Sequence, residues 1–250
     1  MRVLITGSNG FIGKNLIRLL EKTESVEEIM EYGRENSYEE LEAFCTRADA
    51  VFHLAAVLRP KNLSGFDENI DLTSRVMQLL ELAGNKCPIM FASSIQADLD
   101  NPYGQCKRIE EDKFIEYGQR NQVNTYIFRF PNLFGIMSRP NYTSVVSTFC
   151  FNTIKGLPIV VNDPAAKIKF AFIENALENV INIVLNNIPN GANRITTFKD
   201  FYLVGIGELA YYMETLKSQS TPSIHRDDDF YDKLSITYEW YRNNYSMFET

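Results

Sequence analysis

Residues 92–107, ASSIQADLDNPYGQCK, combine hydroxyl, phenol and amine side chains at spacings that allow proton transfer. The Asn101-Pro102 step predicts a helix start, because asparagine caps helices and proline tolerates the first helical position. Tyr103 and Lys107 then lie one turn apart on one helix face. A nearby cation and the positive end of the helix both favour phenolate. We therefore expect the tyrosine proton to be exchangeable near neutral pH.

A serine adds to this pair. The apolar residues 89–92 predict a buried strand, and Ser94 follows it. Its hydroxyl could hold the oxygen that gives or takes the proton of Tyr103. The Tyr-x-x-x-Lys spacing occurs by chance on many helices, so its meaning depends on the elements around it.

The start of the chain predicts an anion site. Residues 3–6 form an apolar strand, and a glycine-rich turn and an amphipathic helix follow. Glycines allow close backbone approach, while free amides and the helix dipole face a pyrophosphate. The candidate dinucleotide-binding residues of this loop are Gly7, Asn9, Gly10, Phe11, Ile12 and Gly13.

The second strand, predicted at residues 28–32, bears on the choice of dinucleotide. Its end should offer a carboxylate to the ribose of NAD or a cation to the extra phosphate of NADP. Glu31 and Arg34 both lie there. Because a guanidinium can grip a phosphate through two hydrogen bonds, we expect NADPH, with NADH the alternative.

The elements that must position these groups alternate between strand and helix. Ser37 and Glu40 form a capping box that opens a helix to residue 48. Further strands are expected at 50–54, 125–130, 158–161 and 201–204, and further helices at 67–83, 103–119, 144–155, 174–185, 207–217 and 227–247. This alternation predicts an α/β fold, a Rossmann-type doubly wound parallel sheet.

The candidate site residues converge on one edge of that sheet. Ligands of such sheets bind at the carboxyl ends of the strands. Gly7, Ala55, Ser94 and Pro131 each follow a predicted strand, so they should meet there. The small residues after the third strand would let a cofactor lie against its end, and the candidates are Leu54, Ala55 and Ala56.

Composition limits the function classes. The 250 residues are 45% hydrophobic, with net charge −7 and a pI of about 5.0, which argues against nucleic acid as a partner. No apolar run reaches membrane-span length and the chain opens on a core strand, so we expect a cytoplasmic protein. The scattered cysteines, with only His53 and His225, suggest neither a disulfide framework nor a metal site.

Together these motifs resemble the extended short-chain dehydrogenase/reductases of the nucleotide-sugar epimerase/dehydratase type. The similar segments are TGSNGFIG, VFHLAA, NIDLT, the Tyr103/Lys107 pair and RFPN at 129–132. The resemblance implies one domain over residues 1–250, with about 1–135 mainly for the dinucleotide and about 136–250 mainly for substrate. It also implies a homodimer.

A closer resemblance extends through FRFPNLFG, RPNYTSVVSTFCF and VND. It is to the reductase domain of bifunctional capsular-polysaccharide enzymes, which reduce a UDP-2-acetamido-2,6-dideoxy-4-keto-hexose with NADPH. Those enzymes carry a further cupin domain, and this chain ends where it would begin. We expect a stand-alone reductase or an excised domain, without the metal chemistry of the cupin.

The resemblance implies a role for each candidate residue. Tyr103 would donate a proton to the keto oxygen, Ser94 would orient the carbonyl, and Lys107 would bind the nicotinamide ribose and tune Tyr103. Pro131 would contact the cofactor. Substrate contacts would come from Ser94, Ile95, Gln96, Asn132 and Arg59, with Arg139, Lys167 and Lys169 as further candidates.

Rival functions share this scaffold. A 4,6-dehydratase usually has Asp-Glu after the catalytic hydroxyl residue, and Ile95-Gln96 stands there, which disfavours dehydration. An NAD-dependent nucleotide-sugar 4-epimerase keeps the same Ser/Tyr/Lys set and is the main alternative. Non-catalytic dinucleotide-sensing relatives commonly lose the tyrosine or lysine, and both are present here.

Overall fold

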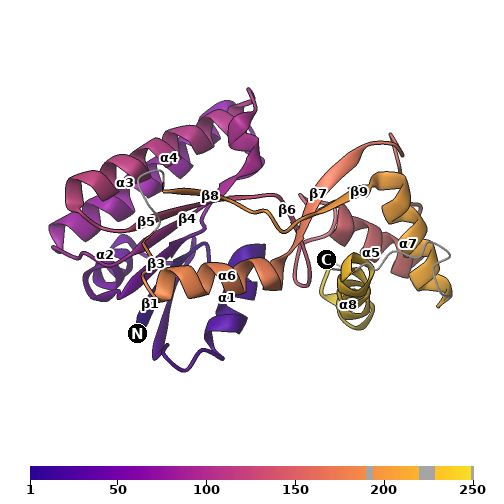
Figure 1. Cartoon of the computed structure of the whole chain (residues 1–250), viewed down its shortest axis with the longest axis horizontal. Helices are drawn as coiled ribbons and strands as arrows, with labels where there is room; N and C mark the ends of the chain where they lie inside the picture. The colour runs from indigo at the N-terminus through magenta and orange to yellow at the C-terminus, as the bar shows by residue number, and fades with distance from the viewer. Residues whose placement is uncertain (190–193, 220–228, 249–250) are drawn as a thin grey trace. The chain divides into compact units, whose positions relative to one another are not determined.

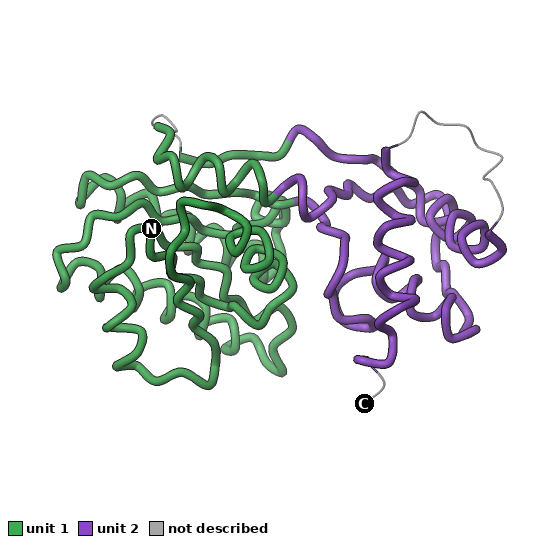
Figure 2. Tube along the Cα trace, turned by 90° about the horizontal axis from the view of Figure 1, so that it is seen from below, with its two compact units in different colours: residues 1–130, 177–198 green, residues 131–176, 199–250 purple. Residues whose placement is uncertain are grey.

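The structure is a computed structural model that describes residues 1–189, 194–219 and 229–248. The chain forms two compact units, shown in Figure 2. Unit 1 contains residues 1–130 and 177–198, and unit 2 contains residues 131–176 and 199–250. Unit 1 therefore takes a segment from the second half of the chain. The functional division at about residue 135 stays a prediction.

Unit 1 is built on a parallel sheet, as predicted (Figure 1). Its strand order is β2-β1-β3-β4-β5-β8, and every pair is parallel. The order reverses between β1 and β3, which is where open α/β sheets bind ligands. The strands are β1 Arg2–Thr6, β2 Glu28–Tyr32, β3 Ala50–His53, β4 Ile89–Ser94, β5 Thr125–Phe130 and β8 Ile195–Thr197.

Helices cover this sheet. One core cluster packs α2, α3 and α4 against the strands, with Val51, Phe91 and Ile127 meeting Phe114 and Tyr117 of α4. The helices are α1 Phe11–Leu20, α2 Tyr38–Arg47, α3 Asp67–Leu82, α4 Pro102–Asn121 and α6 Ile173–Leu185, of which residues 177–185 belong to unit 1. Short 3-10 turns occupy η1 Leu63–Phe66 and η2 Ile95–Asp98. The predicted capping box of Ser37 and Glu40 is present at α2.

Unit 2 has a small mixed sheet and an aromatic core. Its strands β6 Asn132–Phe134, β7 Lys167–Phe172 and β9 Tyr202–Gly205 pair in the order β6-β7-β9, the second pair antiparallel. Phe134, Phe170, Tyr212, Phe230 and Tyr241 form its centre. Its helices are α5 Val145–Lys155, α7 Ile206–Ser218 and α8 Asp229–Asn244, with the 3-10 turn η3 Tyr245–Phe248.

The structure corrects part of the predicted element list. Residues 158–161 form no strand; Ile159 and Val161 instead pack, partly buried, against the core of unit 2. Strands β6, β7 and β8 were not expected, and two of them have only three residues. A strand of three residues is too short to show a periodicity in the sequence. Such strands are stabilised by pairing with partners elsewhere in the chain, which the local sequence does not reveal. His225 and residues 227–228 of the last predicted helix lie outside the described residues.

Candidate active site

The connection from β4 to α4 places the first candidate residues. Ser94 is the last residue of β4, and its hydroxyl accepts a hydrogen bond from the Gln96 amide at 3.1 Å, which starts η2. The Asn101 side chain accepts from the Gly104 amide at 2.8 Å and caps α4, as predicted. Tyr103 therefore lies in the first turn of α4.

Gly104 allows α4 to approach this connection. A Cβ on Gly104 would lie 2.2 Å from the carbonyl oxygen of Gln96 and 2.6 Å from that of Leu99. Both atoms are backbone, so a larger residue would push the helix start away from the segment that follows Ser94. Sequence reasoning missed this role, because the available signal was a glycine directly after Tyr103 inside a helix.

Tyr103 and Lys107 lie on one face of α4. The Lys107 Nζ is 5.8 Å from the centroid of the Tyr103 ring and 4.4 Å from that of Phe91. It also forms a 3.1 Å ion pair with Glu110, and both side chains of that pair are buried. Phe66 of η1 also packs against Tyr103, with ring centroids 6.1 Å apart.

The expected lowering of the Tyr103 pKa is wrong for the isolated chain. Burial raises the pKa of Tyr103 above its ordinary value, Lys107 lowers it, and Glu110 raises it again. The lysine acts in the expected direction, but loss of solvent outweighs it because a phenolate is costly to bury. Burial also lowers the pKa of Lys107, yet Glu110 and Tyr103 more than reverse this, so the ammonium is held charged.

The two adjacent serines of β4 have different surroundings. Ser93 is buried and donates to Glu111 at 2.5 Å. Glu111 in turn accepts two hydrogen bonds from Arg129, which also pairs with Asp98 of η2 at 2.6 Å. Ser94 is partly exposed and outside this cluster. Strand alternation therefore leaves Ser94 as the hydroxyl that a ligand can reach.

The glycine loop fits a dinucleotide. Gly7 has a φ of +73°, and a Cβ on it would lie 2.7 Å from the Cα of Ala55. A Cβ on Gly13 would lie 2.4 Å from the carbonyl oxygen of Gly7. The N-cap Gly10 provides no side-chain acceptor, so the first amides of α1, from Phe11, Ile12 and Gly13, remain for an anion.

The end of β3 lies beside this loop. The amides of Leu54 and Ala55 donate to the hydroxyl of Thr6, at 3.2 and 3.3 Å, which fixes β3 against the end of β1. Ala56 follows, partly exposed like Leu54 and Ala55. The small side chains leave this strand end open to a ligand.

The end of β2 carries the groups that can distinguish NADP from NAD. Arg34 is exposed just beyond the strand, and Glu31 is exposed in it. Sequence reasoning missed Glu35, whose carboxylate accepts from the Asn9 side chain at 2.6 Å and lies over Gly33. Both a cation and a carboxylate are therefore present next to the glycine loop.

An open hollow of about 520 Å³ lies against Tyr103. The cations Arg59 and Lys61 line it together with Asn62 and Phe66. The structure thus brings the candidate Arg59 to the same hollow as Tyr103. Ile95 and Gln96 are at least partly exposed in η2.

The remaining candidates belong to unit 2. Pro131 follows β5 and is buried, and the exposed Asn132 opens β6 and donates to the carbonyl of Lys169 at 3.3 Å. Lys167 and Lys169 are exposed on β7, and Arg139 is exposed in the loop before α5. Their part in substrate binding stays a prediction.

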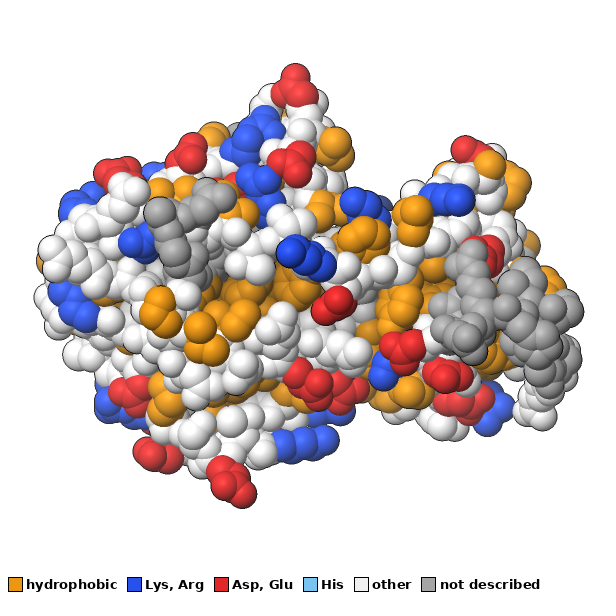
Figure 3. All heavy atoms as spheres, viewed as in Figure 1, with side chains coloured by type: hydrophobic (Ala, Val, Ile, Leu, Met, Phe, Trp, Pro, Cys, Tyr) orange, Lys and Arg blue, Asp and Glu red, His pale blue; other side chains and the backbone are white. Residues whose placement is uncertain are grey.

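One face of the molecule shows no strong separation of charge. On the face in Figure 3, acidic and basic side chains are interspersed. Among the described residues, no helix is both long and apolar enough to span a membrane.

Comparisons with known proteins agree on one family. The model of the NAD dependent epimerase/dehydratase family matches residues 3–194. The chain is 36% identical over 211 residues to a UDP-2-acetamido-2,6-beta-L-arabino-hexul-4-ose reductase of Pseudomonas aeruginosa. This match covers 84% of the chain and 56% of that protein, so the chain spans little more than half the length of its relative.

Solved structures with a similar fold include enzymes and assembly proteins of bacteria. The capsular polysaccharide assembling protein CapF of Staphylococcus aureus superposes with a TM-score of 0.82 at 33% identity, over 96% of this chain and 65% of that one. The Bordetella bronchiseptica enzyme WbmF, solved with NAD+, has a TM-score of 0.81 at 18% identity, over 99% of this chain and 94% of that one. At that identity the second likeness supports the fold alone.

Proposed function

The chain belongs to the NAD dependent epimerase/dehydratase family, and we propose that it reduces the 4-keto group of a UDP-2-acetamido-2,6-dideoxy-hexos-4-ulose. The observation that carries this proposal is the placement of Tyr103 and Lys107 on one face of α4, directly after the strand that ends in Ser94. The relative from Pseudomonas aeruginosa, by its name, acts on a sugar of this kind.

Each site residue has its own role in the proposed reaction. The Ser94 hydroxyl donates to the keto oxygen and orients it, and the Tyr103 hydroxyl transfers its proton to that oxygen as the alcohol forms. The Lys107 ammonium, held charged, binds ribose hydroxyls of the cofactor and stabilises the phenolate left behind. Arg59 and Lys61 offer positive charge to the diphosphate of the substrate.

NADPH is the proposed cofactor, and when bound it supplies the hydride. The glycine loop would hold its pyrophosphate, and the exposed Arg34 would hold its ribose phosphate. Pro131 would contact the cofactor, and Asn132 the substrate diphosphate. A homodimer and a cytoplasmic location complete the proposal.

The test is a coupled assay. Purified protein is mixed with the 4-keto product of a UDP-N-acetylglucosamine dehydratase, and loss of NADPH absorbance is followed, with NADH in parallel. We expect oxidation of NADPH that stops in Tyr103→Phe. If neither cofactor is oxidised, the reductase assignment is wrong, and conversion of a UDP-hexose with bound NAD would instead support an epimerase.

Tyr117→Phe is the matched control. Tyr117 lies on the same helix as Tyr103, and its buried hydroxyl has no hydrogen-bond partner in the part of the chain that the structure describes. Removing that hydroxyl should leave activity unchanged. It should also stabilise the fold by about 1 kcal/mol, because an unpaired buried hydroxyl is costly.

A further inference from the structure

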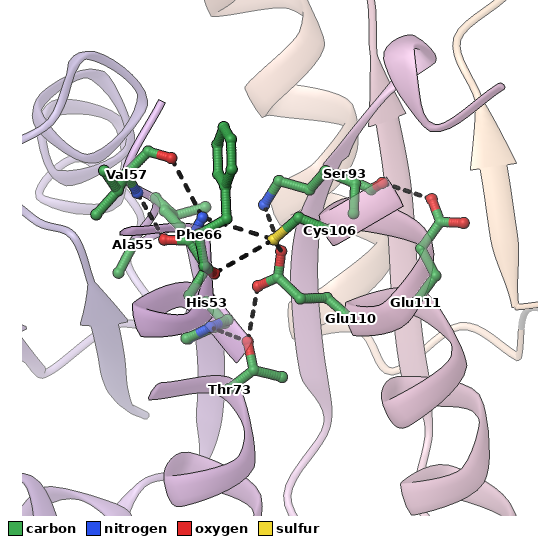
Figure 4. A network of polar contacts seen from close by, with 12 residues as sticks. His53, Ala55, Val57, Phe66, Thr73, Ser93, Cys106, Glu110 and Glu111 are labelled. Atoms are coloured by element: carbon green, nitrogen blue, oxygen red, sulfur yellow. Dashed lines mark hydrogen bonds and ion pairs between the residues drawn. The ribbon is translucent and has the colours of Figure 1, made fainter. Parts of the chain in front are cut away.

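A buried chain of hydrogen bonds connects Lys107 to the start of the glycine loop. The Lys107 ammonium pairs with Glu110 at 3.1 Å, and the other oxygen of Glu110 accepts from Thr73 at 2.8 Å. Thr73 lies 2.9 Å from the Nε2 of His53, and the Nδ1 of His53 lies 2.8 Å from the hydroxyl of Thr6. Figure 4 shows the part of this chain from His53 through Thr73 to Glu110.

The donor and acceptor of every hydrogen bond in this chain follow from the Glu110 carboxylate at one end of it. An ionised Glu110 can only accept, so Thr73 donates to it and must accept from the Nε2–H of His53. Burial lowers the pKa of His53 to about 3, so the ring is neutral and its Nδ1 accepts from Thr6. Thr6 accepts in turn from the Ala55 amide. The geometry therefore assigns the Nε2–H tautomer to His53.

Glu110 is also linked to Tyr103 by Lys107, which pairs with Glu110 and lies near the Tyr103 ring. It is the carboxylate that offsets the ammonium, and it acts on Tyr103 against Lys107. Lys107 lowers the pKa of Tyr103, whereas Glu110 and the thiol of Cys106, which also contacts Glu110 at 3.7 Å, raise it. The cations Arg59 and Lys61 line the hollow beside Tyr103.

We propose that Glu110 is a positioning residue that fixes the Lys107 ammonium and keeps Tyr103 protonated. The proposal rests on the proposed function, because a protonated phenol is the form that reduction of a ketone consumes. When the tyrosine gives its proton to the keto oxygen it becomes phenolate, and it regains a proton from solvent before the next turnover. A carboxylate next to the lysine thus suits the site to reduction.

The first experiment needs no substrate. The protein is labelled with [13Cζ]tyrosine, Tyr103→Phe assigns the Tyr103 resonance, and the resonance is followed against pH. In Glu110→Gln we expect Tyr103 to titrate about one pH unit or more below its position in the unmodified protein. If Tyr103 titrates no earlier in Glu110→Gln, the proposal is overturned.

Two variants separate charge from packing in this titration. Glu111→Gln removes the neighbouring carboxylate, which instead contacts Ser93 and Arg129, so it should leave the Tyr103 titration in place. Thr73→Val removes a hydrogen bond to Glu110 but keeps its charge, so it should move the titration less than Glu110→Gln does. An equal shift in all three variants would indicate loss of structure and would contradict the proposal.

A second measurement tests the anchoring chain. The 15N shifts of His53 should show the Nε2–H tautomer, and an Nδ1–H ring would overturn the assigned chain. Kinetics give a third measurement. As pH rises, the reductase activity of Glu110→Gln should begin to decline at a lower pH than that of the unmodified protein. If the unmodified protein reduces no 4-keto sugar, the proposed function fails, while both NMR results still decide the role of Glu110.

Discussion

The Ser93 hydroxyl donates to Glu111 at 2.5 Å, whereas the hydroxyl of its neighbour Ser94 accepts a hydrogen bond from the Gln96 amide at 3.1 Å. This contrast predicts opposite phenotypes. Ser94→Ala should lower kcat/KM by about a hundredfold, since it removes a donor to the reacting oxygen, and should leave stability nearly unchanged. Ser93→Ala should cost about 1.5–3 kcal/mol of unfolding free energy, because it removes a buried hydrogen bond to a charged group. Urea unfolding and steady-state kinetics on both variants decide; a large activity loss confined to Ser93→Ala would reverse the assignment.

We predict that cofactor preference depends on two neighbouring residues of opposite charge, Arg34 and Glu35. Arg34→Ala should raise the KM for NADPH about tenfold or more and change that for NADH little, because one charge-assisted phosphate contact is lost. Glu35→Ala should weaken the binding of NADH more than that of NADPH, since the carboxylate next to Asn9 can accept a hydrogen bond from the ribose 2′-hydroxyl of NADH, which carries the phosphate in NADPH. Equal effects of Arg34→Ala on both cofactors would show that the guanidinium does not contact the phosphate.

His53 predicts a pH dependence of stability. Burial lowers its pKa to about 3 in the folded chain, below the value of about 6.5 in the unfolded chain. Between these values the unfolded state binds more protons, so stability is lost as pH falls from about 6.5 towards 3. His53→Gln should flatten this decline by about 1.4 kcal/mol for each pH unit, as measured by urea unfolding at successive pH values. An unchanged slope would mean that other groups cause the decline.

Local signals explain what could be predicted from the sequence. The capping box of Ser37 and the Asn101-Pro102 start of α4 act within a few residues, so their patterns are readable along the chain. The spacing of Tyr103 and Lys107 follows from the helix once its start is known.

The contacts that sequence reasoning missed join distant parts of the chain. Thr73 and Glu110 are 37 positions apart, and Ser93 and Glu111 are 18 apart. No periodicity indicates which of two adjacent glutamates will neutralise a lysine and which an arginine. The direction of the Tyr103 pKa shift was wrongly predicted for the same reason, because burial of its side chain depends on Phe66 and on the other residues that line the hollow beside it.

Gly104 offers the sharpest test of how closely α4 must approach β4. In Gly104→Ala the new methyl carbon would meet the backbone oxygens of Gln96 and Leu99 at 2.2 and 2.6 Å, so the helix start must move. Proton transfer needs Tyr103 and Ser94 on the same oxygen, and small misplacements are costly to rate. We expect kcat to fall about a hundredfold, while NADPH affinity, measured by fluorescence, stays within about twofold because the glycine loop is unaffected.

Gly205→Ala is the control for this substitution. A Cβ there would have its nearest neighbour at 3.6 Å, an ordinary contact, and Gly205 has a φ of −71°. It should therefore behave like the unmodified protein in both assays. If Gly104→Ala keeps full kcat, the start of α4 can shift without loss, and close approach of Tyr103 to the strand end that carries Ser94 is not what limits the reaction.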